Sequence, residues 1–196
     1  MSKPNILVIQ ADQLTALCLQ AYGTPYALTP HMDRIAARGT TYLNSYCNSP
    51  VCGPSRASMM TGRLPSNIGV YDNAGEFLSS EPTYAHYLRT LGYQTSLVGK
   101  MHFVGPDKLH GFERRLTTDI YPSDFSWTAD WSQYEEEYSP SRMSLLSVVE
   151  AGTCERSLQV DYDDHVFNIA KQELFDIARS DDERPFFVHA SFTHPH

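Results

Sequence analysis

The chain has 196 residues, 41% of them hydrophobic and 12% aromatic, which is enough to build the buried core of one domain. Its formal net charge of -8 at pH 7 argues against nucleic acid as a partner. No apolar run approaches the roughly 20 residues of a membrane-spanning helix, and the short apolar stretch at residues 6–9 lacks the features of a secretory signal, so we expect a cytoplasmic protein.

Predicted strands and helices alternate along the chain. Residues 6–9, Ile-Leu-Val-Ile, are apolar on both faces and predict a fully buried strand. A helix is expected over residues 29–38, where Thr29 suits the N-cap and Pro30 the first helical position. The pattern then predicts strands at 40–46, 95–98 and 185–192, helices over 55–61, 83–91 and 161–177, and an irregular, exposed segment at 119–139.

This alternation predicts an α/β fold in which helices flank a mostly parallel sheet. Polar side chains follow three of the predicted strands at their C-terminal ends: Asp12 and Gln13, Lys100 and His102, and His194 and His196. In open sheets of this kind, ligands bind in the crevice beyond the carboxyl ends of the strands. We therefore expect these three clusters, distant in sequence, to converge on one site.

Residues 52–56, Cys-Gly-Pro-Ser-Arg, with Thr-Gly following at residues 61–62, form the most specific motif. Cys52 would lie where a helix begins, and the free N–H groups there favour a bound anion. Arg56, one turn later, could pair with an anionic oxygen. The alternative is a Cys-Pro turn before an ordinary helix. The chain has four cysteines, which fit no common zinc spacing and are expected to be free thiols: Cys18, Cys47, Cys52 and Cys154.

The motif at residues 52–62 resembles the sulfatase signature Cys-x-Pro-Ser-Arg with its downstream Thr-Gly. Further segments that are similar to sulfatases lie at residues 4–13, 29–40, 99–102 and 185–196. The resemblance covers nearly the whole chain and implies the alkaline-phosphatase-like fold of the type I, formylglycine-dependent sulfatases. Within that family it is greatest to the choline sulfatases, through residues 11–13, 71–75 and 193–196.

The resemblance implies that a maturation enzyme oxidises Cys52 to formylglycine. The hydrated aldehyde is a geminal diol, of which one hydroxyl attacks sulfur and the other later loses its proton and expels sulfate. The resemblance also implies a divalent cation, Ca²⁺ or else Mn²⁺ or Mg²⁺, held by Asp12, Gln13 and the modified Cys52. An aspartate directly after a strand can alternatively be a helix cap.

The same resemblance implies that Lys100 neutralises sulfate charge and that His102 assists the second proton transfer, although a solvated lysine and an incidental histidine would look the same. His196 fits the position that protonates the leaving alcohol or contacts the sulfate, a role that His194 could share. Asn73 fits an amide that contacts a substrate oxygen, and it is equally suited to forming a turn.

Trp127 and Trp131 lie among the aromatic and acidic residues of the predicted irregular segment. Aromatic faces bind a quaternary ammonium well, and nearby acids add attraction. Trp127 is therefore the candidate contact for the choline part of choline-O-sulfate. The alternative is a loop that packs its own aromatic side chains, or packs them against another subunit.

We therefore expect hydrolysis of a sulfate ester, choline-O-sulfate in particular. The pair Asp12-Gln13, which stands where many sulfatases have two acids, leaves open a phosphonate monoester or phosphodiester hydrolase of the same superfamily. A second alternative is an inactive fragment or partner chain that needs a C-terminal half. A cysteine peptidase using Cys52 and His196 is improbable because its family motifs are missing.

Residues 1–196 are expected to form the N-terminal part of a sulfatase catalytic domain. By the resemblance, the remaining metal ligands and a second active-site lysine lie in a later segment. We therefore expect this segment to be inactive by itself, since Ca²⁺ needs six to eight oxygen ligands. The complete protein is expected to be a homo-oligomer.

Overall fold

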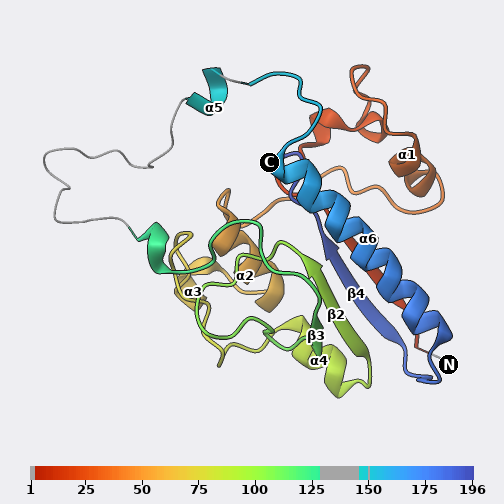
Figure 1. The fold of residues 1–196 in the computed structure, drawn as a ribbon, viewed down its shortest axis with the longest axis vertical. Helices are drawn as coiled ribbons and strands as arrows, with labels where there is room; N and C mark the ends of the chain where they lie inside the picture. The colour runs from red at the N-terminus through yellow and green to blue at the C-terminus, as the bar shows by residue number, and fades with distance from the viewer. Residues whose placement is uncertain (1–2, 129–145, 150) are drawn as a thin grey trace, which may run out of the picture.

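The computed structural model describes residues 3–128, 146–149 and 151–196. At its centre is a parallel sheet in the order β1-β4-β2-β3 (Figure 1). The strands are β1 (Ile6–Gln10), β2 (Gln94–Gly99), β3 (Arg114–Arg115) and β4 (Phe186–Ser191). Because β4 lies between β1 and β2, Val188 pairs with both Leu7 and Ser96. The carboxyl ends of these parallel strands lie at the same edge of the sheet.

Helices cover both faces of the sheet. The described helices are α1 (Pro30–Ala36), α2 (Cys52–Thr61), α3 (Pro65–Ile68), α4 (Tyr84–Thr90), α5 (Leu146–Val149) and α6 (Leu158–Arg179), with short 3-10 helices η1 (Ala16–Cys18), η2 (Gln20–Tyr22) and η3 (Phe125–Trp127); α1 and α5 lie away from the sheet (Figure 1). Helix α6 runs along one face (Figure 1), where Val166 packs against Val98 and Ala190. Leu97 and Phe187, which point to the opposite face, join the larger apolar cluster with residues of α2, α3 and α4.

Most predicted elements are confirmed. The helices expected over 29–38, 55–61, 83–91 and 161–177 correspond to α1, α2, α4 and α6, and the strands expected at 6–9, 95–98 and 185–192 correspond to β1, β2 and β4. Helix α2 begins three residues earlier than predicted, at Cys52. Pro54 lies in its first turn, where the missing N–H has no intrahelical partner to lose.

Two predictions are wrong. Residues 40–46 form no strand and are largely exposed, with Tyr42 at 71% and Tyr46 at 87%. The strand β1 is not fully buried either, because Leu7 and Ile9 are 44% and 62% exposed at the edge of the described sheet. Within the predicted irregular segment, residues 119–128 are irregular apart from η3, and residues 129–139 lie outside the described part of the chain.

The end of β2 approaches β4 so closely that position 99 cannot hold a side chain. Gly99 has a left-handed φ of 100°, and a Cβ atom there would lie 1.9 Å from the Ser191 carbonyl oxygen. The next residue, Lys100, donates its N–H to the same oxygen at 3.0 Å. The first residue after β2 is thereby fixed directly beside the end of β4.

Two sequence-based expectations concern the chain as a whole. Within the described ranges, no helix combines the length and the hydropathy that crossing a bilayer requires. The four cysteines are free thiols, as predicted.

Candidate active site at the carboxyl edge of the sheet

Residues that follow three different strands meet at Cys52, the first residue of α2. The Lys100 Nζ atom, just beyond β2, lies 3.6 Å from the Cys52 Sγ atom. The His196 Nε2 atom, beyond β4, lies 3.9 Å from the same sulfur. Asp12, beyond β1, contacts Lys100, and its ligand atom lies within 4.8 Å of those of Cys52 and His196. Members of the three predicted clusters thus share one site.

A buried group of charges surrounds Asp12. Its Oδ2 atom forms ion pairs with Lys100 and, at 3.2 Å, with Arg56. Burial opposes ionisation of Asp12, but the hydrogen bond from Lys100 and the charges of Arg56 and Lys100 outweigh it and lower the pKa of the carboxyl. Two cations beside one carboxylate leave a net positive charge, which suits an anionic substrate.

The Arg56 guanidinium makes its hydrogen bonds to groups of the protein itself. Its side chain is 3% exposed, and Nη1 donates to the Lys100 carbonyl oxygen at 2.6 Å and to Ser191 Oγ at 3.0 Å. Nη2 donates to Asp12 at 3.2 Å. The guanidinium therefore ties α2 to the ends of β1, β2 and β4. The sequence suggested a direct partner for an anion, whereas these contacts indicate that Arg56 holds the groups that would face one.

Asn73 fixes the first turn of α2. Its Oδ1 atom accepts the Gly53 N–H at 2.8 Å, so a contact with a substrate oxygen would have to come from the amide NH₂ group. Its backbone carbonyl lies 3.0 Å from His102 Nε2, which must carry the proton because a carbonyl only accepts. Asn73 thus connects the helix that carries Cys52 to the turn that carries His102.

The turn after β2 is held by a carboxylate that the sequence did not single out. Asp119 Oδ1 accepts the N–H groups of Met101 and His102 at 2.6 and 3.0 Å, and Oδ2 pairs with Arg115 at 2.5 Å. His102 has a left-handed φ of 58°. Burial lowers the pKa of its ring, and the hydrogen bond to Asn73 only partly offsets this effect. The described contacts place His102 beside Asn73 and give it none with Cys52.

Two aromatic side chains border the site. The Tyr121 ring lies 5.1 Å from Lys100 Nζ and 5.9 Å from the His196 ring. The Trp127 ring lies 6.4 Å from the His102 ring, and its Nε1 donates to the Pro122 carbonyl at 2.8 Å. Trp127 is 49% exposed and so has a free face. The other predicted tryptophan, Trp131, lies outside the described residues.

His194 and Gln13 lie at the margin of the site. His194 Nδ1 is 2.7 Å from Asp163 Oδ2 on α6, which directs this ring toward α6. Gln13 is exposed with a left-handed φ of 58°, and its side chain makes no hydrogen bond to the described residues. Both side chains retain polar atoms for a ligand.

Asp12 and Gln13 offer the oxygen atoms that a divalent cation of the predicted kind requires. Hard cations prefer oxygen ligands, so the carboxylate of Asp12 and the free amide of Gln13 fit one. The thiol of Cys52 fits poorly unless its sulfur is replaced by oxygen. The Lys100 ammonium would share the Asp12 carboxylate with such a cation.

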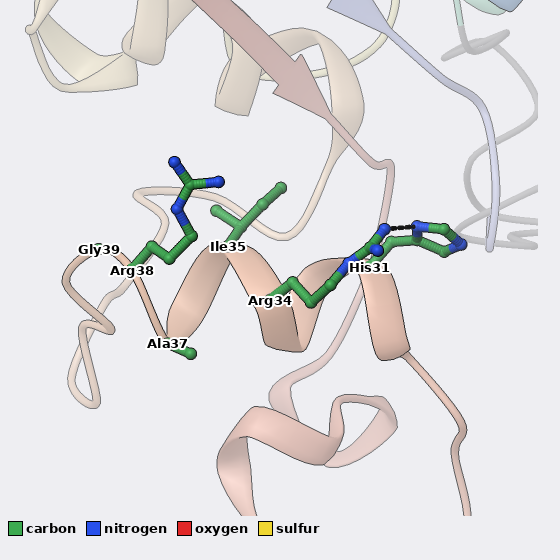
Figure 2. Close-up of a pocket in the computed structure, with 6 residues that line it drawn as sticks. All are labelled: His31, Arg34, Ile35, Ala37, Arg38 and Gly39. Atoms are coloured by element: carbon green, nitrogen blue, oxygen red, sulfur yellow. Dashed lines mark hydrogen bonds between the residues drawn. The ribbon is translucent and has the colours of Figure 1, made fainter.

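A hollow of about 770 Å³ lies elsewhere, beside α1. Its walls are His31, Arg34, Ile35, Ala37, Arg38 and Gly39 (Figure 2). None of these belongs to the predicted clusters, and the Arg34 guanidinium is hydrogen-bonded to His31 in Figure 2. We therefore place the candidate active site at the carboxyl edge of the sheet and not in this hollow.

A buried histidine lies beneath the charges. His189 on β4 is 1% exposed, and its ring nitrogens lie 2.7 Å from the Tyr84 hydroxyl and 2.8 Å from Gln10 Oε1. Burial, with the nearby charge of Arg56 as the second cause, lowers the pKa of His189 to about 3. The ring is therefore neutral, and Nε2 carries the proton that it donates to Gln10.

The depressed pKa of His189 makes stability fall in acid. Below pH 6.5, the ordinary pKa of histidine, the unfolded chain binds a proton at His189, whereas the folded chain does not bind it until about pH 3. The free energy of unfolding should therefore decrease between those limits, by up to about 1.4 kcal/mol per pH unit from this group. The free energy of unfolding, measured with urea, should decrease less steeply between pH 6 and 4.5 in His189→Gln than in the parent protein. His165→Gln, at an exposed position of α6, is the matched control. Equal slopes in all three proteins would contradict this assignment.

Comparisons of this chain with a family model, with protein sequences and with solved structures agree with one another. The family model described as Sulfatase matches residues 4–196. The choline-sulfatase of Rhizobium meliloti (strain 1021) is 49% identical over 197 residues, which cover 99% of this chain and 38% of that protein. Arylsulfatase A of Bos taurus is 40% identical over 127 residues, covering 59% of this chain and 25% of that protein. The fold also matches the phosphonate monoester hydrolase of Agrobacterium radiobacter, with a TM-score of 0.66, 24% identity, and coverage of 99% of this chain and 41% of that one. The chain thus spans less than half the length of each of these proteins.

Proposed function

The chain belongs to the sulfatase family, and from this we propose that the protein hydrolyses a sulfate ester at its sulfur–oxygen bond, with choline-O-sulfate as the preferred substrate. The observation that carries the proposal is the surrounding of Cys52. An ammonium, an imidazole and a carboxylate from three strand ends converge on this one side chain. The 49% identity to a choline-sulfatase supports the choice of ester.

We take Cys52 to be the precursor of the nucleophile. The pentapeptide at residues 52–56 supports its conversion to formylglycine by a maturation enzyme. The hydrated formylglycine would supply an oxygen nucleophile together with a second hydroxyl that releases sulfate. Cys52 is only partly buried at the start of α2, where backbone N–H groups and the positive end of the helix dipole favour an anion.

The charged residues prepare the site for a negative substrate. The Lys100 ammonium, 1% exposed and held by Asp12, lies beside the attacking atom and would stabilise the charge that develops on the sulfate oxygens. Arg56 keeps both Asp12 and the Lys100 backbone in place. Because these groups are fixed before substrate arrives, little reorganisation accompanies the reaction.

His196 is the proposed proton carrier. Its Nε2 atom faces Cys52 at 3.9 Å, within reach of a proton on the nucleophile or on the leaving alcohol. Burial, with the charge of Lys100 as the second cause, lowers the pKa of His196 and favours the neutral ring that accepts a proton. It could then return this proton to the leaving oxygen. His102 would support the second proton transfer indirectly, because its Nε2 already donates to the Asn73 carbonyl.

A divalent cation, Ca²⁺ or else Mn²⁺ or Mg²⁺, would be held by Asp12, Gln13 and the oxygen of the converted Cys52. When bound, it would supply positive charge against the sulfate. Its remaining ligands, on this proposal, come from outside the present chain. The free thiols support a reducing compartment, in keeping with a cytoplasmic homo-oligomer.

The second candidate is a phosphonate monoester or phosphodiester hydrolase, which the exposed neutral Gln13 favours. The two candidates are separated, in the complete protein that contains this chain, by measuring inorganic sulfate released from choline-O-sulfate and from an arylsulfate, and alcohol released from a phosphonate monoester. Faster turnover of choline-O-sulfate would support the proposal. A higher kcat/KM for the phosphonate monoester would replace it by the second candidate.

In the complete enzyme that contains this chain, Trp127 should determine the preference for the choline ester. The sulfate end is the same in all substrates, and the trimethylammonium group has no hydrogen-bond donor, so an aromatic face is the means of recognising it. Cation–π contacts contribute about 0.5 to 2 kcal/mol, so Trp127→Ala should lower kcat/KM for choline-O-sulfate by roughly 2- to 30-fold. Arylsulfate turnover should change less. Phe125→Ala, at an exposed position of the same 3-10 helix, is the control, and equal losses on both esters would indicate a structural role for Trp127.

A further inference from the structure

Asp163 on α6 lies within hydrogen-bonding distance of three donors beyond β4. Its Oδ1 atom accepts the Thr193 N–H at 2.7 Å. Its Oδ2 atom accepts the His194 N–H at 2.9 Å and lies 2.7 Å from His194 Nδ1. The carboxylate side chain is 14% exposed, so these bonds are largely shielded from water. Figure 1 shows the end of the chain beside the start of α6, where this contact forms.

The segment that Asp163 binds is connected to both sides of the candidate active site. The His194 carbonyl accepts the Asp12 N–H at 3.1 Å, which links the turn to the strand end that carries Asp12. The Thr193 carbonyl accepts the His196 N–H at 3.1 Å, which closes the turn that presents His196 to Cys52. A shift of this turn would therefore move an acid and an imidazole of the site together.

A carboxylate beside an imidazole also selects its tautomer. Since an ionised carboxylate only accepts hydrogen bonds, His194 Nδ1 carries the proton. The Nε2 atom is then the nitrogen left to face a ligand. Asp119 holds the turn after β2 by the same arrangement, two adjacent N–H groups on one carboxylate. Each histidine-bearing turn is thus held by an acid that does not itself reach Cys52 in the described contacts.

From these contacts we infer that Asp163 is a positioning residue of the active site. It holds residues 193–196 so that His196 faces Cys52, and it keeps His194 in the Nδ1-protonated form. The part of this inference that concerns turnover rests on the proposed function. The part that concerns the tautomer does not.

The test compares Asp163→Asn with Asp164→Asn in the complete protein that contains this chain, which is the parent protein. Asp164 is the next residue of α6, with its side chain 59% exposed and paired with Arg156. The amide introduced by Asp163→Asn would keep one oxygen but turn an NH₂ group toward N–H donors. Carboxylates that orient histidines typically contribute about 10- to 100-fold, so kcat for the sulfate ester should fall by that factor with KM little changed. Asp164→Asn should behave as the parent protein does.

Nitrogen-15 NMR of labelled histidine provides the readout that is independent of turnover. The His194 signals, assigned with His194→Gln, should show the Nδ1-protonated form in the parent protein and in Asp164→Asn. They should shift toward the Nε2-protonated form in Asp163→Asn. Asp163→Glu, which keeps the charge, should restore the tautomer in part and serves as the test if Asp163→Asn does not fold.

The outcomes separate the two proposals. If the complete parent protein hydrolyses no sulfate ester, the proposed function fails and the tautomer still decides the inference. If the parent is active and Asp163→Asn keeps both its kcat and the parent tautomer, the inference is wrong. The inference is also wrong if Asp163→Glu loses as much kcat and as much of the Nδ1-protonated form as Asp163→Asn does, because the carboxylate would then have no specific role.

Discussion

Replacing Cys52 with alanine should abolish hydrolysis of the sulfate ester, with kcat/KM falling by about 10⁴-fold or more, as expected when a nucleophile is deleted. The reason is that two groups of the site converge on this one side chain. The Lys100 ammonium at 3.6 Å and the His196 ring at 3.9 Å both serve whatever atom occupies that position. Alanine leaves these groups in place with nothing to act on.

Cys47→Ala is the matched control, because Cys47 is exposed and lies five residues before Cys52 without a described contact to the site. Its turnover should equal that of the parent protein. Peptide mass spectrometry of the active parent should show that residue 52 has lost sulfur and gained oxygen. Full activity with an unmodified thiol would refute the formylglycine proposal, and full activity of Cys52→Ala would remove Cys52 from the mechanism.

Replacing Arg56 with methionine should lower the free energy of unfolding by about 3 to 5 kcal/mol, the usual effect of deleting one partner of a buried ion pair. Methionine retains much of the apolar stem but none of the donors. The carbonyl of Lys100 and the hydroxyl of Ser191 would each lose a hydrogen bond, and Asp12 would lose one of its two cations. Urea unfolding measures the change.

Arg63→Met is the matched control in the same stretch of sequence. Arg63 is 44% exposed and pairs with Glu81, and exposed pairs contribute about 0 to 1 kcal/mol. A loss for Arg56→Met no larger than that for Arg63→Met would contradict the view that the buried guanidinium holds the strand ends together.

The sequence predicts the fold well where local pattern decides it. Apolar runs located β1, β2 and β4, and caps such as Pro30 and Gly62 bounded the helices. The rule that ligands bind at the carboxyl ends of parallel strands brought Asp12, Lys100 and His196 into one predicted site. That prediction needed no knowledge of side-chain contacts, only the positions at which strands end.

What the sequence did not predict depends on contacts between distant segments. Asp119 was placed in an exposed segment, yet its carboxylate is largely buried against Arg115 and two backbone N–H groups. Asp163 looked like any polar residue of an amphipathic helix. No local pattern distinguishes an acid that binds a neighbouring turn from one that faces water, since both satisfy the same helical periodicity. The absent strand at residues 40–46 has the same origin, because a segment with strand-forming residues becomes a strand only where a partner strand is available.

The position of β4 in the sheet bears on the order of events during synthesis. This strand is the partner of β1 and of β2, yet it begins at Phe186, 134 residues after Cys52. At about 5 to 20 residues per second, the ribosome takes roughly 7 to 27 s to cover that distance. During this interval the sheet cannot assemble, and neither Lys100 nor His196 can be fixed against Cys52. On the proposed function, a maturation enzyme would have these seconds in which to reach the pentapeptide before the strand ends close around it.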